Sequence, residues 1–346
     1  MTRIVPVHSA DDPAIYEAAR LLREGELVAF PTETVYGLGA NALNAEAVAK
    51  IFAAKGRPST DPLIVHVSDL DMLRRVPFDL PPAAEGLAAL WPAPLTLIVK
   101  RPSVVPTLVS AGLDTIGLRM PDHPIALALI RAAGVPIAAP SANRFAHTSP
   151  TSAQHVYDDL NGSVAMILDA GVTAVGVESS IVDVTSDPPR LLRPGGLSLE
   201  TIRTYLPDIQ VAERLSDVSD EAMTAPGMLL KHYSPDAPLI LFEGDNYSVR
   251  EAIRLEAERN LTEGVSVGIL AAEEDRAALD LPAVHFIALG SLTDLATIAQ
   301  RLYASLREME QAQVDIILAR AFPTKGHGLA IRDRLLRAAA GNVIQV

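Results

Sequence analysis

The chain alternates short apolar runs with helical patterns, and this alternation constrains its fold more than any other feature. In the first 206 residues, strand-like runs occupy 26–30, 62–67, 95–100, 115–120, 136–140, 165–170 and 180–185. Helical patterns occupy 44–55, 124–133, 152–160 and 198–206. Some strands follow one another closely, so they do not all pair in parallel. We predict an α/β fold with a mixed sheet that is largely covered by helices.

The last part of the chain shows a more regular alternation. Strand-like runs at 238–242, 265–270, 283–289 and 314–320 are interspersed with helical patterns at 247–260, 293–311 and 329–340. This pattern is typical of a doubly wound parallel sheet. The intervening stretch is polar, irregular and punctuated by proline, as a linker is. We predict a first domain over 1–206, a linker over 207–237 and a smaller second domain over 238–346.

Composition and charge exclude several classes of function. The chain has no cysteine, which excludes disulfides, thiolate metal sites and cysteine nucleophiles. It shows no signal-peptide pattern and no apolar run of membrane-spanning length, so we expect a cytoplasmic protein with no membrane partner. Of the net charge of −13, residues 1–210 carry −6 and the rest −7. Because both parts of the chain are acidic, we do not expect a broad basic surface that binds nucleic acid in a salt-dependent way. Any site for a polyanion must therefore be a small, local group of cations.

The stretch PTETVYGLGA (31–40) follows a strand and is rich in hydroxyl groups and backbone donors. In α/β proteins, ligands bind where strands end. One interpretation is therefore a binding loop, and the other is a tight glycine turn that joins a strand to a helix. The two glycines do not form GxGxxG, so a dinucleotide site has no support.

The stretch KGRPSTDPLIVHV (55–67) reads first as a helix end. Lys55 suits a helix C-terminus, Gly56 suits a left-handed cap, and Pro58 prevents continuation. This reading leaves Arg57 and His66 unexplained. A lone histidine in an apolar strand is more often a core or edge residue than a ligand.

The stretch APSANRFAHTSPTSAQHV (139–156) joins a strand to a helix through a loop rich in serine, threonine and asparagine. Ser149 or Thr151 is expected to cap the helix, and free amides at such a helix start suit a phosphate. Capping does not explain Ser141 or Asn143.

Polar groups thus stand at the ends of many strands, which predicts one composite anion-binding cleft. They are Thr34, Lys55, Arg57, His66, Arg119, Ser141, Asn143, Ser179 and Arg193. The sequence contains no Walker A, HExxH, GxSxG or EF-hand pattern.

Five motifs, taken in order, resemble one known family. PTETVYGLGANA, KGRPSTDPLIVHV, SANRFAHTSPT, ESSIVDV and LLRPGG are similar in order and spacing to the YrdC-like domain of threonylcarbamoyl-adenylate synthases. KHYSPDAPL and GHGLAIRDRLLRAA resemble the longer, two-domain form. The resemblance implies a YrdC-like mixed-sheet catalytic domain followed by a Rossmann-like accessory domain.

The resemblance also implies an activity. The family is a nucleotidyltransferase that converts ATP, bicarbonate or CO2 and L-threonine into L-threonylcarbamoyl-AMP and pyrophosphate, with magnesium. The product serves threonylcarbamoyladenosine modification of tRNAs that decode ANN codons, completed by a separate transferase system. Threonine first becomes a carbamate, which then attacks the α-phosphate of ATP. Because two anions meet, nearby cations and magnesium must offset their repulsion.

Residue roles follow from the same resemblance. The ATP-binding residues it implies are Lys55, Arg57, Asp61, Thr115, Ser141, Asn143, Ser149, Arg193 and Tyr233, the last closing over ATP from the linker as part of a lid. The threonine-binding residues it implies are Thr34, His66, Arg119, Ala139 and Ser179. Lys55 and Arg57 are also the expected catalytic residues. No protein ligand set for a metal is implied, and magnesium is expected to be held mainly by the ATP phosphates.

Three positions depart from the family pattern. Asp61 replaces an expected asparagine, which suggests a contact with magnesium or ribose, or a turn cap. Ala146 replaces a usual glycine, and Asp333 replaces an asparagine near the C-terminus.

Two other functions remain as alternatives. One is an RNA-binding module related to translation, since YrdC-like domains have been viewed as binding double-stranded RNA. A weak contact with tRNA is therefore one of the partners we consider. The other is carbamoyl transfer in metallo-enzyme maturation, but the zinc-finger cysteines expected there are absent. For the second domain, which has no GxGxxG or P-loop, we expect a regulatory or lid-supporting role.

Overall fold

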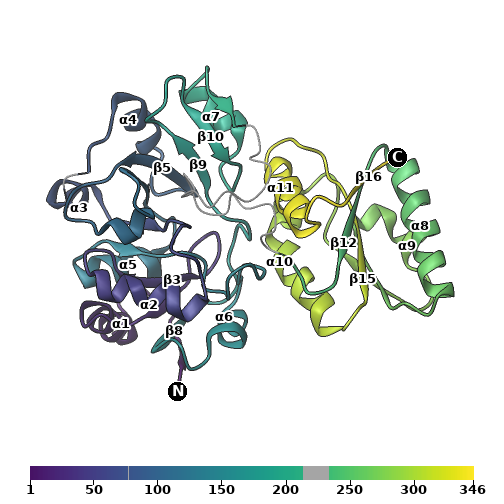
Figure 1. Cartoon of the computed structure of the whole chain (residues 1–346), viewed down its shortest axis with the longest axis horizontal. Helices are drawn as coiled ribbons and strands as arrows, with labels where there is room; N and C mark the ends of the chain where they lie inside the picture. The colour runs from purple at the N-terminus through teal and green to yellow at the C-terminus, as the bar shows by residue number, and fades with distance from the viewer. Residues whose placement is uncertain (77, 213–233) are drawn as a thin grey trace. The chain divides into compact units, whose positions relative to one another are not determined.

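Figure 1 shows the computed structural model, which describes residues 1–76, 78–212 and 234–346. The chain forms two compact units. The first comprises Met1–Phe145 and Ser149–Met228, and the second comprises Ala146–Thr148 and Leu229–Val346. No helix in the described part of the chain is long and apolar enough to cross a membrane.

Eleven strands in the described part of the first unit form one sheet in the order β1-β8-β2-β3-β7-β4-β6-β5-β9-β10-β11. The strands are β1 (Arg3–Pro6), β2 (Val28–Phe30), β3 (Gly37–Asn41), β4 (Ile64–His66), β5 (Leu95–Lys100), β6 (Thr115–Arg119), β7 (Ile137–Ala138), β8 (Met166–Asp169), β9 (Ser180–Asp183), β10 (Arg190–Arg193) and β11 (Gln210–Val211). Parallel pairs such as β4 and β6 alternate with antiparallel pairs such as β5 and β6. The predicted mixed sheet is confirmed.

Most described helices of the first unit begin at a capping side chain. The helices are α1 (Pro13–Arg23), α2 (Ala45–Lys55), α3 (Leu70–Arg75), α4 (Pro82–Ala88), the 3₁₀ helix η1 (Thr107–Ser110), α5 (Pro124–Ala133), α6 (Ala153–Leu160) and α7 (Leu199–Tyr205). Helices α4 and η1 are the exceptions, with no capping side chain. Helix α2 starts at the capping side chain of Asn44 and ends at Gly56, whose φ of 63° is left-handed as predicted. Helix α6 is capped by Ser152. The expectation of a cap at Ser149 or Thr151 is therefore wrong, because Ser149 turns to another partner described below.

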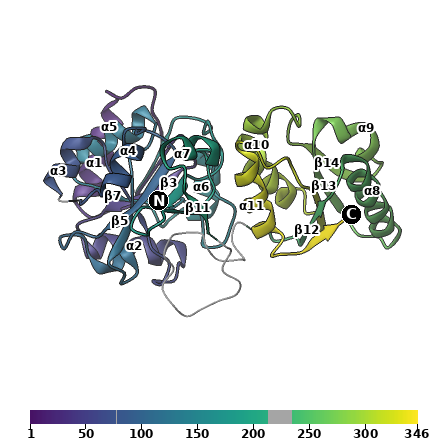
Figure 2. The same ribbon diagram turned by 90° about the horizontal axis from the view of Figure 1, so that it is seen from above.

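The second unit contains a parallel sheet in the order β14-β13-β15-β12-β16 among the described residues. Its elements are β12 (Leu239–Glu243), α8 (Asn246–Thr262), β13 (Val267–Ala271), η2 (Glu273–Asp275), α9 (Arg276–Leu279), β14 (Val284–Ala288), α10 (Leu295–Gln311), β15 (Ile316–Arg320), α11 (Gly328–Ala338) and β16 (Val343–Gln345). Figures 1 and 2 show α8 and α9 on one face of this sheet and α10 and α11 on the other. The doubly wound sheet is confirmed, although its strand order is not the 3-2-1-4-5 order of dinucleotide-binding folds.

One of the two interpretations of residues 31–40 is wrong. Gly37–Asn41 forms strand β3, antiparallel to β2, rather than a glycine turn that leads into a helix. A Cβ atom on Gly39 would lie 2.9 Å from a ring carbon of Phe30 and 3.2 Å from the carbonyl oxygen of Val28. Glycine is therefore required here for close strand packing, not for a turn.

The structure shows the backbone conformation of Ala146 and the partners of Asp333, two residues that depart from the family pattern. Ala146 has a φ of 68°, in the left-handed region that favours glycine. Asp333 is buried in α11, where its Oδ2 atom accepts hydrogen bonds from Arg334 at 2.6 Å and Arg337 at 3.0 Å. Asp333 thus carries a charge that these two cations offset.

Candidate functional site

A buried arginine connects the end of one central strand to the loop that follows β2. Arg119 ends β6, and its Nη2 atom donates to Glu33 Oε1 at 2.5 Å and to Thr34 Oγ1 at 2.9 Å. The Thr34 hydroxyl also lies 2.8 Å from the hydroxyl of Thr32. All four side chains are buried. The contacts fix the predicted threonine-binding residues Thr34 and Arg119 against each other.

His66 lies beside Arg119 because β4 and β6 are parallel and these two residues are partners in register. Its Nδ1 atom lies 3.2 Å from the Ile64 carbonyl, and its ring meets the edge of Phe30. Burial, and secondarily the charge of Arg119, lowers the pKa of His66 to about 3. His66 is therefore a neutral hydrogen-bonding group in this site. The backbone N–H of Ala139 donates to the same Ile64 carbonyl at 2.9 Å.

Ser179 joins the same group through β5. Thr96 pairs with Arg119 in register, and its hydroxyl lies 2.7 Å from that of Ser179. Arg193 Nη2 donates to the Ser179 carbonyl at 3.0 Å and to its hydroxyl at 3.3 Å. A Cβ atom on Gly195 would lie 2.3 Å from the Glu178 carbonyl oxygen, so the Pro-Gly-Gly turn after β10 packs directly on this segment.

Lys55 ties the end of α2 to the loop after β7. Its Nζ atom donates to the carbonyls of Ser141 at 2.6 Å and Asn143 at 2.5 Å. Burial, followed by the charge of Arg57, holds the pKa of Lys55 well below its usual value. The structure therefore brings Lys55, Ser141 and Asn143 together. Their contact with ATP stays a prediction.

Arg57 forms a buried ion pair with Asp61, the residue that departs from the family pattern. Arg57 Nη2 lies 2.8 Å from Asp61 Oδ1 and donates to the Pro62 carbonyl at 2.7 Å. Its Nε atom donates to the Asp61 carbonyl at 3.1 Å. Both side chains are at most 3% exposed. Asp61 thus offsets the charge of Arg57 and holds the loop between α2 and β4.

The remaining predicted residues are distributed less closely. Ser149 donates at 2.6 Å to Oε1 of Glu178, the residue that precedes Ser179 in the chain. Thr115 begins β6, whereas Arg119 ends that strand. Tyr233, and most of the predicted lid over 207–237, lie outside the described residues.

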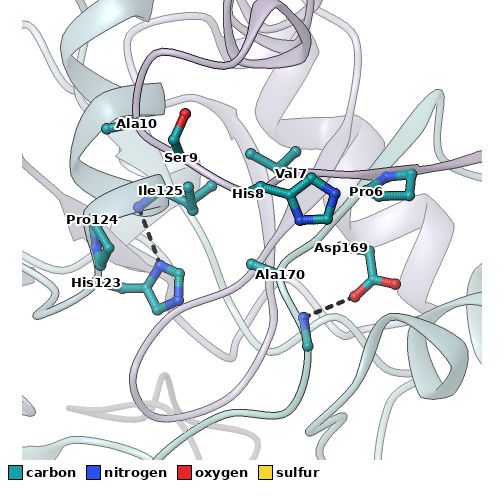
Figure 3. A pocket seen from close by; sticks show the side chains of 11 residues that line it. Pro6, Val7, His8, Ser9, Ala10, His123, Pro124, Ile125, Asp169 and Ala170 are labelled. Carbon is teal, nitrogen blue, oxygen red and sulfur yellow. Dashed lines mark hydrogen bonds between the residues drawn. The ribbon is translucent and has the colours of Figure 1, made fainter.

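A pocket of 510 Å³ opens where β1, β8 and the start of α5 meet (Figure 3). His8, His123 and Asp169 supply its titratable side chains. The His123 Nδ1 atom accepts the backbone N–H of Ile125 at 3.3 Å and so caps α5. Burial lowers the pKa of His123. The carboxylate of Glu33 and, to a smaller extent, that of Asp122 act in the opposite direction. Sequence reasoning did not identify this pocket, or Glu33 as a site residue, although an acid between two threonines was a signal.

Two family models together match most of the chain. The model of Sua5, YciO and YrdC proteins, described as "Telomere recombination", matches residues 20–195. The model described as "Threonylcarbamoyl-AMP synthase, C-terminal domain" matches residues 197–340. The chain belongs to the threonylcarbamoyl-AMP synthase family.

Two relatives within the threonylcarbamoyl-AMP synthase family match over nearly their full length. The threonylcarbamoyl-AMP synthase of Bacillus subtilis (strain 168) is 47% identical, over 97% of this chain and 96% of that protein. The protein of the same name from Pyrococcus abyssi is 44% identical over 100% of both. The crystal structure described as P. abyssi Sua5 complexed with L-threonine has a TM-score of 0.93 and 42% identity, and covers 100% of this chain and 99% of that one.

The buried His66 in this member of the threonylcarbamoyl-AMP synthase family predicts a pH dependence of stability. Below pH 6.5 an unfolded histidine binds a proton that folded His66, with a pKa of about 3, does not. His66 therefore lowers the free energy of unfolding by about 1.4 kcal/mol per pH unit as the pH falls from about 6 to about 3. His66→Gln removes this contribution. Urea unfolding at pH 7, 6 and 5, followed by the fluorescence of Trp91, measures it.

From pH 6 to pH 5 the wild type is expected to lose about 1.2 kcal/mol more than His66→Gln, since the unfolded histidine is already partly protonated at pH 6. The exposed His8 provides a control, and His8→Gln is expected to follow the wild type. Equal pH dependence in the wild type and His66→Gln would show that His66 is protonated in the folded protein.

Proposed function

We propose that the chain is an L-threonylcarbamoyladenylate synthase, which converts L-threonine, bicarbonate or CO2 and ATP into L-threonylcarbamoyl-AMP and pyrophosphate. The full-length identity to two proteins named threonylcarbamoyl-AMP synthase carries this proposal. The likeness to a crystal structure that contains L-threonine supports the amino acid as substrate. In reaction class the enzyme is a nucleotidyltransferase.

Threonine binds, in this proposal, at the group of residues around Arg119. Arginine matches a carboxylate in charge and shape, so Arg119 receives the threonine carboxylate. The Thr34 and Ser179 hydroxyls and neutral His66 offer hydrogen bonds without adding charge, and the backbone at Ala139 completes the site. Thr34 and Ser179 are fully buried and His66 is nearly so, which holds them in fixed orientations.

ATP binds, in this proposal, where the remaining cations gather. Lys55, Arg57 and Arg193 are assigned to its phosphates, and Lys55 and Arg57 also to catalysis. Asp61, Thr115, Ser141, Asn143, Ser149 and Tyr233 are assigned as the further ATP contacts. Among the described residues, no group of three histidine or acidic side chains is placed to hold a metal ion. In this proposal magnesium is held mainly by the ATP phosphates, where it supplies positive charge.

The chemistry needs no covalent intermediate with the enzyme. Threonine is carboxylated on its nitrogen, and a carbamate oxygen attacks the α-phosphorus of ATP while pyrophosphate leaves. The protein contributes by orienting the two anions and by placing cations beside them. A site closed to water also protects the mixed anhydride product from hydrolysis.

The product places the protein in a sequence of reactions. An acyl-adenylate is an activated group, so a separate transferase must accept it, and we propose transfer to the tRNA adenosine beside the anticodon. A cytoplasmic location is part of this proposal. A direct contact with tRNA is not required for the first step.

Release of pyrophosphate tests the proposed function. With ATP, magnesium and bicarbonate present, we expect pyrophosphate release only when L-threonine is added. Mass spectrometry should detect threonylcarbamoyl-AMP in the same sample. Pyrophosphate release that is independent of threonine would contradict the proposal.

The Arg57–Asp61 ion pair generates a second prediction. Asp61→Asn removes the negative charge that offsets Arg57 and places a net positive charge beside the proposed phosphate site. We expect tighter ATP binding, by roughly threefold to tenfold at low ionic strength, since each factor of ten corresponds to about 1.4 kcal/mol. Calorimetric titration with ATP measures the affinity.

A surface pair provides the matched control for this substitution. Asp71→Asn breaks the exposed Arg74–Asp71 pair and is expected to leave ATP affinity unchanged. Weaker ATP binding by folded Asp61→Asn would contradict this prediction, because it would show that losing the Asp61 carboxylate as an ATP contact outweighs the gain from the uncompensated charge of Arg57.

A further inference from the structure

Two buried charged groups at the threonine site each retain one atom without a partner. Within the residues that the structure describes, Glu33 Oε2 and Arg119 Nε make no hydrogen bond. The two side chains are 7% and 5% exposed and contact each other through their other atoms. A buried charged atom without a hydrogen bond is costly, so such atoms in a binding site indicate where a ligand's polar groups fit.

The two atoms have opposite chemical requirements. Arg119 Nε needs an acceptor, and Glu33 Oε2 needs a donor. A free α-amino acid offers both from one carbon atom, as a carboxylate and an ammonium group. The Arg119–Glu33 pair is therefore complementary to the zwitterion rather than to the carboxylate alone.

We propose that Glu33 binds the α-ammonium group of the amino acid substrate and accepts the proton which that group loses when the carbamate forms. This inference rests on the proposed function. It assigns a catalytic role to a residue that the sequence reasoning left without one, and it makes the free ammonium group a condition for binding.

The proton balance of carbamate formation requires an acceptor. An ammonium group and bicarbonate together give a carbamate, one water molecule and one proton. The N–H bond breaks as an O–H bond forms at Glu33, and the free amine then uses its electron pair to bond to the carbonyl carbon. If CO2 is the reactant, the carboxylated amine loses one more proton, which passes to solvent.

The charges around Glu33 change in the direction that favours this transfer. Arg119 pairs with Glu33 before substrate binds, and the substrate carboxylate then shares that cation. Carboxylation replaces the neighbouring ammonium by an anion, which favours a protonated carboxyl group. Of the other groups nearby, His66 faces Arg119 and His123 caps α5 with its Nδ1 atom. Burial lowers the pKa of both histidines, so neither supplies a competing cation at neutral pH.

Glu33→Gln separates this role from simple support of Arg119. The glutamine side chain has the same length, and its amide oxygen can still accept from Arg119 Nη2. It carries no negative charge and accepts no proton. Glu33→Asp keeps the charge and the acid–base chemistry on a shorter side chain, so it should weaken the reaction yet preserve its pH dependence.

The matched control loses a similar ion pair elsewhere. Glu243 Oε1 accepts from Arg332 Nε at 2.6 Å in the second unit, and Glu243→Gln weakens that pair. Circular dichroism and Trp91 fluorescence confirm that each variant is folded before kinetics are measured.

Threonine-dependent pyrophosphate release is measured between pH 7 and pH 9 at saturating ATP and bicarbonate. For Glu33→Gln we expect a threonine KM at least about tenfold higher. We also expect a rate at saturating threonine that rises by up to about tenfold per pH unit at the acidic end of this range and levels off toward the ammonium pKa, because it follows the free amine fraction. The wild type, Glu33→Asp and Glu243→Gln are expected to show a shallower pH dependence. N-acetyl-L-threonine should not compete with L-threonine for the wild type.

The outcomes distinguish this inference from the proposed function. If folded Glu33→Gln keeps the threonine KM or the pH dependence of the wild type, Glu33 does not have this role. Competition by N-acetyl-L-threonine would also overturn it. If the wild type itself releases no threonine-dependent pyrophosphate, the proposed function fails instead.

Discussion

The Arg119–Glu33 ion pair is the contact on which the arrangement of the site depends. An uncompensated guanidinium at the end of a buried strand would be strongly destabilising, so the loop after β2 must bring its carboxylate there. Once that loop is fixed, its carbonyls accept further backbone donors. The Val175 N–H donates to Glu33 and the Gly176 N–H to Thr34, which positions the segment that leads to Ser179. The Arg119–Glu33 ion pair thus positions both the loop after β2 and the segment that leads to Ser179.

Three buried cations of the first unit, Lys55, Arg57 and Arg193, are each placed by their own local partners. Lys55 is surrounded by carbonyls, Arg57 is paired with Asp61, and Arg193 donates to the Ser179 segment. Each cation is buried and held by local partners. This arrangement fits recognition of a small, strongly charged molecule at one place.

The sequence predicted the mixed sheet, the parallel second sheet and the Gly56 helix end, because apolar periodicity and caps are local properties. It did not predict β3, since the close packing of Gly39 on Phe30 depends on a partner strand. It also offered Ser149 or Thr151 as the helix cap, whereas Ser152 caps the helix and the Ser149 hydroxyl reaches Glu178, 29 residues away in the chain. Glu33 was missed for the same reason: its significance arises only when β6 brings Arg119 beside it. Pairings between distant segments are the part that local patterns do not contain.

A crystal structure of the full chain with bound L-threonine would show whether the Arg119–Glu33 pair binds the amino acid. The threonine carboxylate is expected within hydrogen-bonding distance of Arg119 Nε and the ammonium within hydrogen-bonding distance of Glu33 Oε2, with Thr34 and Ser179 nearby. A threonine molecule bound with its ammonium group away from Glu33, or bound at a place that Arg119 does not reach, would contradict this expectation.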